Sequence, residues 1–122
     1  MKTRVISAAF TLAAILLAPA MVRAHAFLDH ADPAVGSTVP TAPTVLHIWF
    51  TQELEPAFSS IHVTDKSGAS VSDGSSGVDP SNNQEMDIKL KPLPPGTYTV
   101  KWHALSVDTH TTQGDFTFQV KG

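Results

Sequence analysis

The chain has 122 residues, no cysteine, and eleven acidic against eight basic side chains, which gives a net charge of −3 with histidine neutral. This length has room for one small domain, whose core must form without disulfide bonds. The acidic balance argues against a nucleic-acid-binding protein, which would carry a basic patch. The missing thiols exclude blue-copper and thiolate zinc sites, so any metal must be held by nitrogen and oxygen donors.

Residues 1–24 have the pattern of a cleaved secretory signal peptide. Two basic residues near the start are followed by an apolar run, and Val22-Arg23-Ala24 places small or moderately small residues at the two positions that signal peptidase reads. We therefore predict an exported mature domain over 25–122 that begins at His25. This domain carries five basic residues against eleven acidic ones, a net charge of −6 with histidine neutral.

Two alternatives concern the same segment. Cleavage after Ala18-Pro19-Ala20 would leave Met21 at the front of the mature chain. The apolar run could instead be a membrane anchor, but it is shorter than the about 20 apolar residues that a span requires. The cleavage pattern that follows the run favours the signal peptide.

Short runs of alternating apolar and polar residues follow, and none has a helical period. The expected strands are 26–28, 45–50, 60–64, 69–72, 85–90, 97–105 and 116–120. Pro40 and Pro43 argue against a central strand between the first two, and 73–83, rich in Ser, Gly, Asp and Asn, is expected to be an exposed loop. Roughly seven short strands predict an all-β fold, an antiparallel β-sandwich, with a small closed barrel as the alternative.

His25 is the first candidate metal ligand. As the first residue of the mature chain, it would offer its free α-amine and its imidazole Nδ1 to the same ion. The alternative is a chain end that follows a cleavage site and has no further role.

Asp108 and His110 are the second candidate group. Residues two apart in an extended segment point to one face, so the carboxylate and the imidazole could bind one ion while Thr109 points away. Gly114 would let the chain turn tightly into the last strand. The alternative is a solvated loop with a local Asp–His hydrogen bond. If His25 meets this pair, the three residues form an N,N,N,O site, which favours Cu(II) among divalent first-row ions.

The other histidines have weaker patterns. His47, His62 and His103 lie opposite the apolar faces of their strands, and we interpret them as surface imidazoles. His30 could approach the N-terminal site or bind a second ion. Met86 continues a core stripe and needs no redox role.

With these residues in place, the chain resembles the CopC family of periplasmic copper-binding proteins over essentially all of 25–122. The resemblance rests on His25-Ala26-Phe27-Leu28, Asp32-Pro33-Ala34-Val35-Gly36-Ser37, the strand 45–50, Pro95-Gly96-Thr97-Tyr98-Thr99-Val100-Lys101-Trp102, Ser106-Val107-Asp108-Thr109-His110 and Gly114-Asp115-Phe116-Thr117-Phe118-Gln119-Val120. It implies an immunoglobulin-like sandwich or Greek-key barrel that binds one Cu(II) per chain. The implied ligands are the amine and imidazole of His25, the carboxylate of Asp108 and the imidazole of His110.

The chain departs from the family pattern at three points. Some members carry a Met-rich Cu(I) site, whereas Met86 is the sole methionine after the predicted cleavage point. Some have a glutamate directly after the second strand, where this chain has Gln52, with Glu53 one position later. The family often has arginine in place of His103.

The leading hypothesis is a periplasmic Cu(II)-binding protein for copper storage, delivery or resistance, which is not an enzyme and has no membrane span after cleavage. Relatives occur beside, or fused to, an inner-membrane copper permease of the CopD type, which is the implied partner. One alternative is a copper monooxygenase: lytic polysaccharide monooxygenases also begin with a metal-binding histidine, but here Asp108 would fill an equatorial position. The other alternative is a metal-free interaction module.

Overall fold

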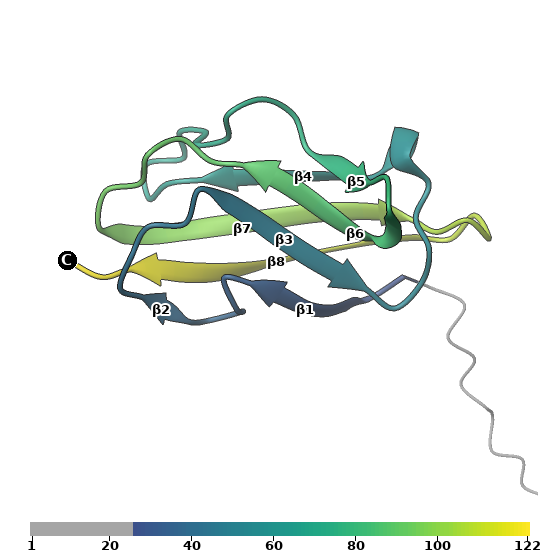
Figure 1. Cartoon of the computed structure of the whole chain (residues 1–122), viewed down its shortest axis with the longest axis horizontal. Coiled ribbons are helices and arrows are strands. Elements are labelled where there is room, and N and C mark those ends of the chain that lie inside the picture. Colours follow the sequence, from purple (N-terminus) through teal and green to yellow (C-terminus); the bar gives the residue numbers. More distant parts are fainter. Residues whose placement is uncertain (1–25) are drawn as a thin grey trace, which may run out of the picture.

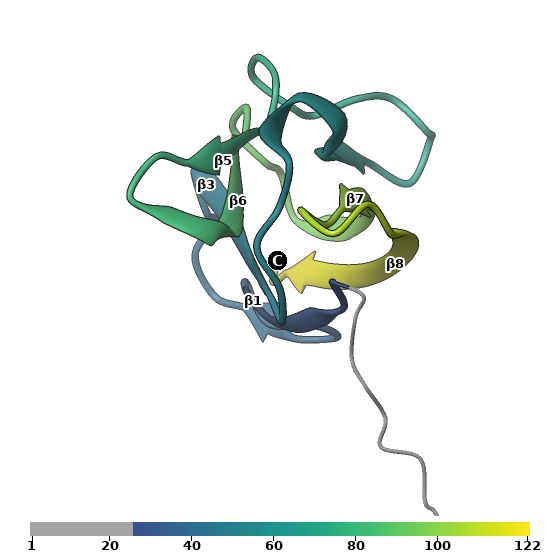
Figure 2. The same ribbon diagram turned by 90° about the vertical axis from the view of Figure 1, so that its right-hand side faces the viewer.

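The protein folds into two stacked β-sheets; the structure is a computed structural model that describes residues 26–122 (Figures 1 and 2). The strands are, in chain order, β1 (Leu28–Asp32), β2 (Thr38–Val39), β3 (Val45–Phe50), β4 (Ser60–Thr64), β5 (Gly77–Asp79), β6 (Asn82–Lys89), β7 (Gly96–Leu105) and β8 (Thr111–Val120). One sheet has the order β1-β3-β6-β5 and the other β2-β8-β7-β4. A single-turn 3-10 helix, η1 (Pro56–Phe58), lies between β3 and β4 in the chain. The predicted all-β sandwich is confirmed.

The strands that alternate most regularly in sequence were predicted best. β3 and β4 have the predicted bounds, β7 and β8 contain the predicted segments, and β6 covers the predicted strand 85–90 except for its last residue. The predicted strand 26–28 is wrong in position, because β1 begins at Leu28 and continues to Asp32. The predicted strand 69–72 is also wrong: only the isolated bridges Thr64–Ser70 and Ser72–Leu90 form there.

Two short edge strands bring the number to eight, against the seven expected. β2 pairs in parallel with the end of β8, which makes the second sheet mixed, and Pro40 directly follows it. Proline is compatible with an edge position because it removes only one backbone donor there. β5 lies inside the segment 73–83 that was expected to be a loop, and it pairs with β6. Both strands form through backbone pairing with a longer neighbouring strand, and neither has an apolar pattern of its own.

The core lies between the two sheets, where alternate residues of each strand point inward. Its members are at most 9% exposed. They include Leu46, Ile48, Phe50, Ile61, Val63, Met86, Ile88, Tyr98, Val100, Trp102, Ala104, Phe116, Phe118 and Val120. The chain has no cysteine, so this packing stabilises the fold without disulfide bonds. In residues 26–122 we find no helix with the length and apolar character needed to span a bilayer.

The longest pairing in the protein joins β7 to β8. It runs through ten antiparallel pairs, from Gly96 opposite Val120 to Leu105 opposite Thr111. Gly114 lies inside β8, opposite Trp102, so the expectation that this glycine serves a turn is wrong. The glycine is needed instead because the Trp102 ring occupies the space that a side chain would fill.

We predict that Gly114→Ala lowers the free energy of unfolding by about 1–3 kcal/mol, the usual cost of overpacking a core. The added Cβ would lie 2.7 Å from Cζ2 and 3.0 Å from Cε2 of Trp102, so the indole must move. The matched control is Gly77→Ala in β5, where an added Cβ has no neighbour within 4 Å. Urea unfolding of the two variants measures the difference, and equal stabilities would contradict this explanation of Gly114.

Candidate metal centre

The loop 106–110 closes the β7–β8 hairpin around one buried serine. Ser106 is fully buried, and its N–H donates to the carbonyl of His110 at 3.0 Å. Its hydroxyl donates to the Asp108 carboxylate and accepts from the backbone N–H of His110 at 3.3 Å. The backbone N–H of Thr109 donates to the Ser106 carbonyl at 2.8 Å. One side chain therefore holds the backbone and the carboxylate of the loop in a single arrangement.

The loop is a turn and not the extended segment that the sequence suggested. Thr109 has φ +75°, in the left-handed region that β-branched residues rarely adopt. The side chains of Asp108 and His110 nevertheless converge, with His110 Nδ1 3.3 Å from Asp108 Oδ1. Both are nearly half exposed, so they remain accessible to an ion from solvent. The two-residue spacing correctly predicted that these side chains meet, but the predicted cause, an extended segment, was wrong.

The Asp108 carboxylate is stabilised in its charged form. The hydrogen bond from Ser106 lowers its pKa most. Burial opposes this effect in part, and the hydrogen bonds and charge of His110 lower the pKa further. A carboxyl whose pKa lies below its ordinary value keeps its negative charge to lower pH. Asp108 is therefore an anionic oxygen donor throughout the range in which imidazoles exchange protons.

The described chain begins beside this loop. Ala26 is fully buried, and its carbonyl accepts a hydrogen bond from Thr112 Oγ1 at 2.5 Å. Phe27 is bonded to Thr51 through two hydrogen bonds. Its N–H donates to Thr51 Oγ1 at 3.0 Å, and its carbonyl accepts from the Thr51 N–H at 2.9 Å. Because Thr112 is two residues after the loop, these bonds fix the start of the chain near Asp108 and His110.

The predicted ligand His25 lies outside the described residues, so its position stays a prediction. The two other histidines considered for this site have partners of their own. His30 Nδ1 lies 2.7 Å from Asp29 Oδ2. His103 Nδ1 lies 3.2 Å from the Phe58 carbonyl oxygen.

His47 was interpreted as a surface imidazole, and it does lie on the outer face of its strand, but the sequence did not predict its partners. It is 34% exposed, and it lies between the carboxylates of Glu85 and Asp87. Burial lowers the pKa of His47, but the hydrogen bonds and charges of Asp87 and Glu85 outweigh this effect and raise it overall. Contact with Asp87, together with burial, raises the pKa of Glu85. The alternation predicted that all three side chains point outward, but not that β3 and β6 are neighbours. His62 is exposed, as expected.

Comparison with known proteins finds one matching domain family, several related sequences and similar solved structures. Residues 28–121 match the CopC domain. The chain is 37% identical over 106 residues to Protein YobA of Escherichia coli (strain K12), covering 82% of each protein. It is 32% identical over 115 residues to Copper resistance protein C of Pseudomonas syringae pv. tomato, covering 89% of this chain and 90% of that one. The crystal structure of PcoC, a copper resistance protein from Escherichia coli, superposes with a TM-score of 0.71 at 32% identity, covering 78% of this chain and 99% of that chain.

We predict that Ser106→Ala loosens the loop and lowers the free energy of unfolding by about 1–3 kcal/mol, because buried polar groups lose their partner. It should also raise the pKa of Asp108 toward its ordinary value, since Ser106 contributes most to the lowering. Urea unfolding and an NMR titration of the Asp108 carboxyl measure the two effects.

The matched control for Ser106→Ala is Ser72→Ala. The Ser72 hydroxyl is the buried side-chain polar group that has no hydrogen-bond partner within residues 26–122. Its removal should change stability little, because no hydrogen bond is lost. If both variants unfold alike and the Asp108 titration does not move, Ser106 does not organise the loop.

Proposed function

Because the chain belongs to the CopC family, we infer that it binds copper and serves copper resistance. We propose that it holds one Cu(II) per chain through the α-amine and imidazole of His25, the carboxylate of Asp108 and the imidazole of His110. The observation that carries this proposal is the convergence of Asp108 and His110 beside the backbone of Ala26. The residue before Ala26 is His25, so a chain that starts there brings its amine to the same end of the sandwich.

The proposal requires maturation of the chain. Removal of residues 1–24 would free the α-amine of His25, and it implies a periplasmic protein whose mature domain spans 25–122. In that setting the protein would store copper or deliver it, and an inner-membrane copper permease of the CopD type is the partner that we propose.

The donor chemistry supports Cu(II) over Cu(I). Nitrogen and carboxylate donors suit Cu(II), whereas Cu(I) prefers the sulfur of Cys and Met. The chain has no cysteine, and Met86 is fully buried in the core. The negative charge of Asp108 stabilises the higher oxidation state more, which disfavours the reduced copper that oxygen activation needs. We therefore propose a carrier rather than a monooxygenase.

We predict that Asp108→Ala, His110→Ala and the addition of one alanine before His25 each weaken Cu(II) binding by at least about 100-fold, since changes to residues that only support metal ligands already cost about 10- to 100-fold. Competition titration of the exported protein measures the affinity, and EPR of the bound ion reports its nitrogen donors. His62→Ala is the matched control, because His62 is exposed on β4. An extended N-terminus that binds Cu(II) as tightly as the native one would exclude the amine as a ligand.

Copper affinity should fall as the pH drops from about 8 to 6, the range in which an α-amine and an imidazole take up protons. Asp108 should contribute little to this fall, because its pKa is lowered and its carboxylate stays ionised there. The slope of log affinity against pH then corresponds to more than one proton per copper. Competition titrations at several pH values give this slope, and a flat profile would contradict the nitrogen ligand set.

A further inference from the structure

We propose a second metal site, on the outer face of the β1-β3-β6-β5 sheet, formed by His47 of β3 with Glu85 and Asp87 of β6. The site would take a divalent first-row transition ion, Cu(II) or Zn(II). It goes beyond the copper site proposed above, because it shares no residue with the loop 106–110.

The three donor atoms lie close enough to share one ion. His47 Nδ1 is 2.7 Å from Asp87 Oδ1 and 3.1 Å from Glu85 Oε2. One ligand atom from each residue lies within 4.8 Å of the other two. Zinc binds nitrogen and carboxylate oxygen at about 2.0–2.2 Å in tetrahedral geometry, so two donors on one ion are about 3.4 Å apart. Small side-chain adjustments would therefore let the three groups bind the same ion.

The sheet register places these residues together. β3 and β6 are antiparallel, with His47 opposite Asp87 and Trp49 opposite Glu85. Residues two apart on one strand share a face, so all four side chains point away from the core. Cross-strand neighbours have Cβ atoms about 4.5–5.5 Å apart. The ligands are thus attached to the backbone of paired strands, which fixes their separation better than a loop would.

Trp49 orients the cluster from the side. Its Nε1–H donates to Glu85 Oε1 at 3.1 Å, which leaves Oε2 directed at His47. The indole stacks against the His47 ring with centroids 5.7 Å apart, and against the His30 ring at 4.4 Å. Partners of this kind fix the orientation of metal ligands and are a usual part of metal sites.

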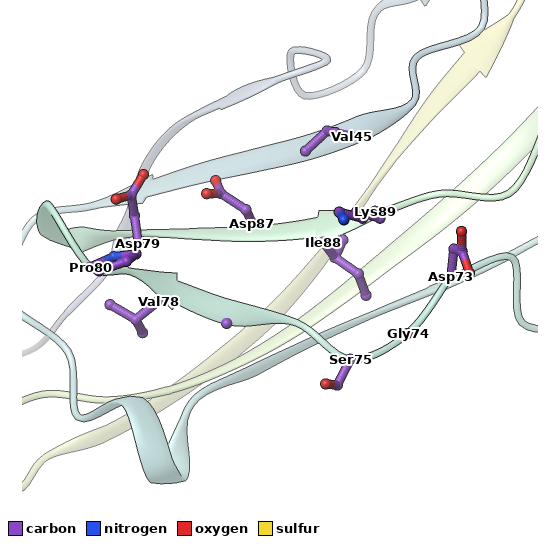
Figure 3. A pocket seen from close by; sticks show the side chains of 11 residues that line it. Val45, Asp73, Gly74, Ser75, Val78, Asp79, Pro80, Asp87, Ile88 and Lys89 are labelled. Carbon is purple, nitrogen blue, oxygen red and sulfur yellow. The ribbon is translucent and has the colours of Figure 1, made fainter.

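Charge and access also suit a cation. With His47 neutral, Glu85 and Asp87 bring two negative charges together, and a divalent ion would neutralise both. Asp87 also lines an open cavity of about 460 Å³ along β5 and β6, together with Asp79 and Lys89 (Figure 3). Figure 3 shows the carboxylates of Asp87 and Asp79 on the same side of these strands. An ion could therefore reach the cluster from solvent.

The same distances also describe an ion pair in which a protonated His47 donates to the two carboxylates. Binding measurements separate the two explanations. The exported protein is titrated with Cu(II) and, in a parallel series, with Zn(II), and bound metal per chain is counted by equilibrium dialysis. Because Cu(II) bound at His47 would lie close to the Trp49 indole, tryptophan fluorescence reports its binding.

Besides the Cu(II) proposed for His25, Asp108 and His110, we expect a second Cu(II) per chain that binds more weakly and quenches tryptophan fluorescence. His47→Gln should weaken that second binding event by at least about tenfold, and Trp49→Phe should remove most of its quenching, while both keep the first event. His62→Gln, an exposed histidine on the other sheet, is the matched control and should bind both ions. The Asp108→Ala/His110→Ala double variant should lose the first event and keep the second.

Several results would overturn the second site. One is that the native protein binds a single ion. Another is that the second binding event survives in His47→Gln. If His47→Gln does not fold, as judged by circular dichroism, Glu85→Gln and Asp87→Asn replace it, and unchanged binding in both would have the same meaning. A first event that survives loss of Asp108 and His110 would instead contradict the proposed copper site and leave the second site standing.

Discussion

The ten antiparallel pairs between β7 and β8 determine both the core and the position of the loop 106–110. A shift of one residue in this register would turn the inward side chains of one of the two strands to solvent, either those of β7, such as Trp102, or those of β8, such as Phe118. Burial of these side chains therefore selects a single register. That register leaves Leu105 opposite Thr111, and the five residues between them must form a tight connection at the end of the sheet. The exposed side chains of Asp108 and His110 are thus positioned by residues of the core.

The protein holds the two groups of side chains that we propose as metal ligands in different ways. The loop 106–110 depends on a buried hydroxyl, that of Ser106, and on an unfavourable backbone angle at Thr109. The cluster around His47 depends only on the register of two paired strands. In both groups the side chains already converge, so binding of an ion would cost little side-chain freedom. The loop can change shape if its hydrogen bonds break, whereas the strand pair cannot without disrupting the sheet.

The alternation of apolar and polar residues predicted the strands in which that alternation is regular. β3 and β4 alternate cleanly and were found with their bounds, whereas β2 and β5 are too short to show a pattern and form by pairing with neighbours. The spacing of Asp108 and His110 indicated a pair, but no sequence signal announces the left-handed conformation of Thr109 between them. His47 meets its carboxylates only across a strand pair, which alternation along a single strand cannot reveal. The proposed role of His25 rests on the cleavage pattern and on family membership.

The two ends of the described chain lie at opposite ends of the sandwich. Ala26 is bonded to Thr112 near the start of β8, and Gly122 follows the last residue of the same strand, Val120. Eight residues of extended strand separate these points by about 26 Å. In Figure 1 the C-terminus accordingly lies on the side away from the β7–β8 connection. A fusion partner or surface linkage at Gly122 would leave the loop 106–110 facing the medium, so the protein can be displayed without covering the end that carries Asp108 and His110.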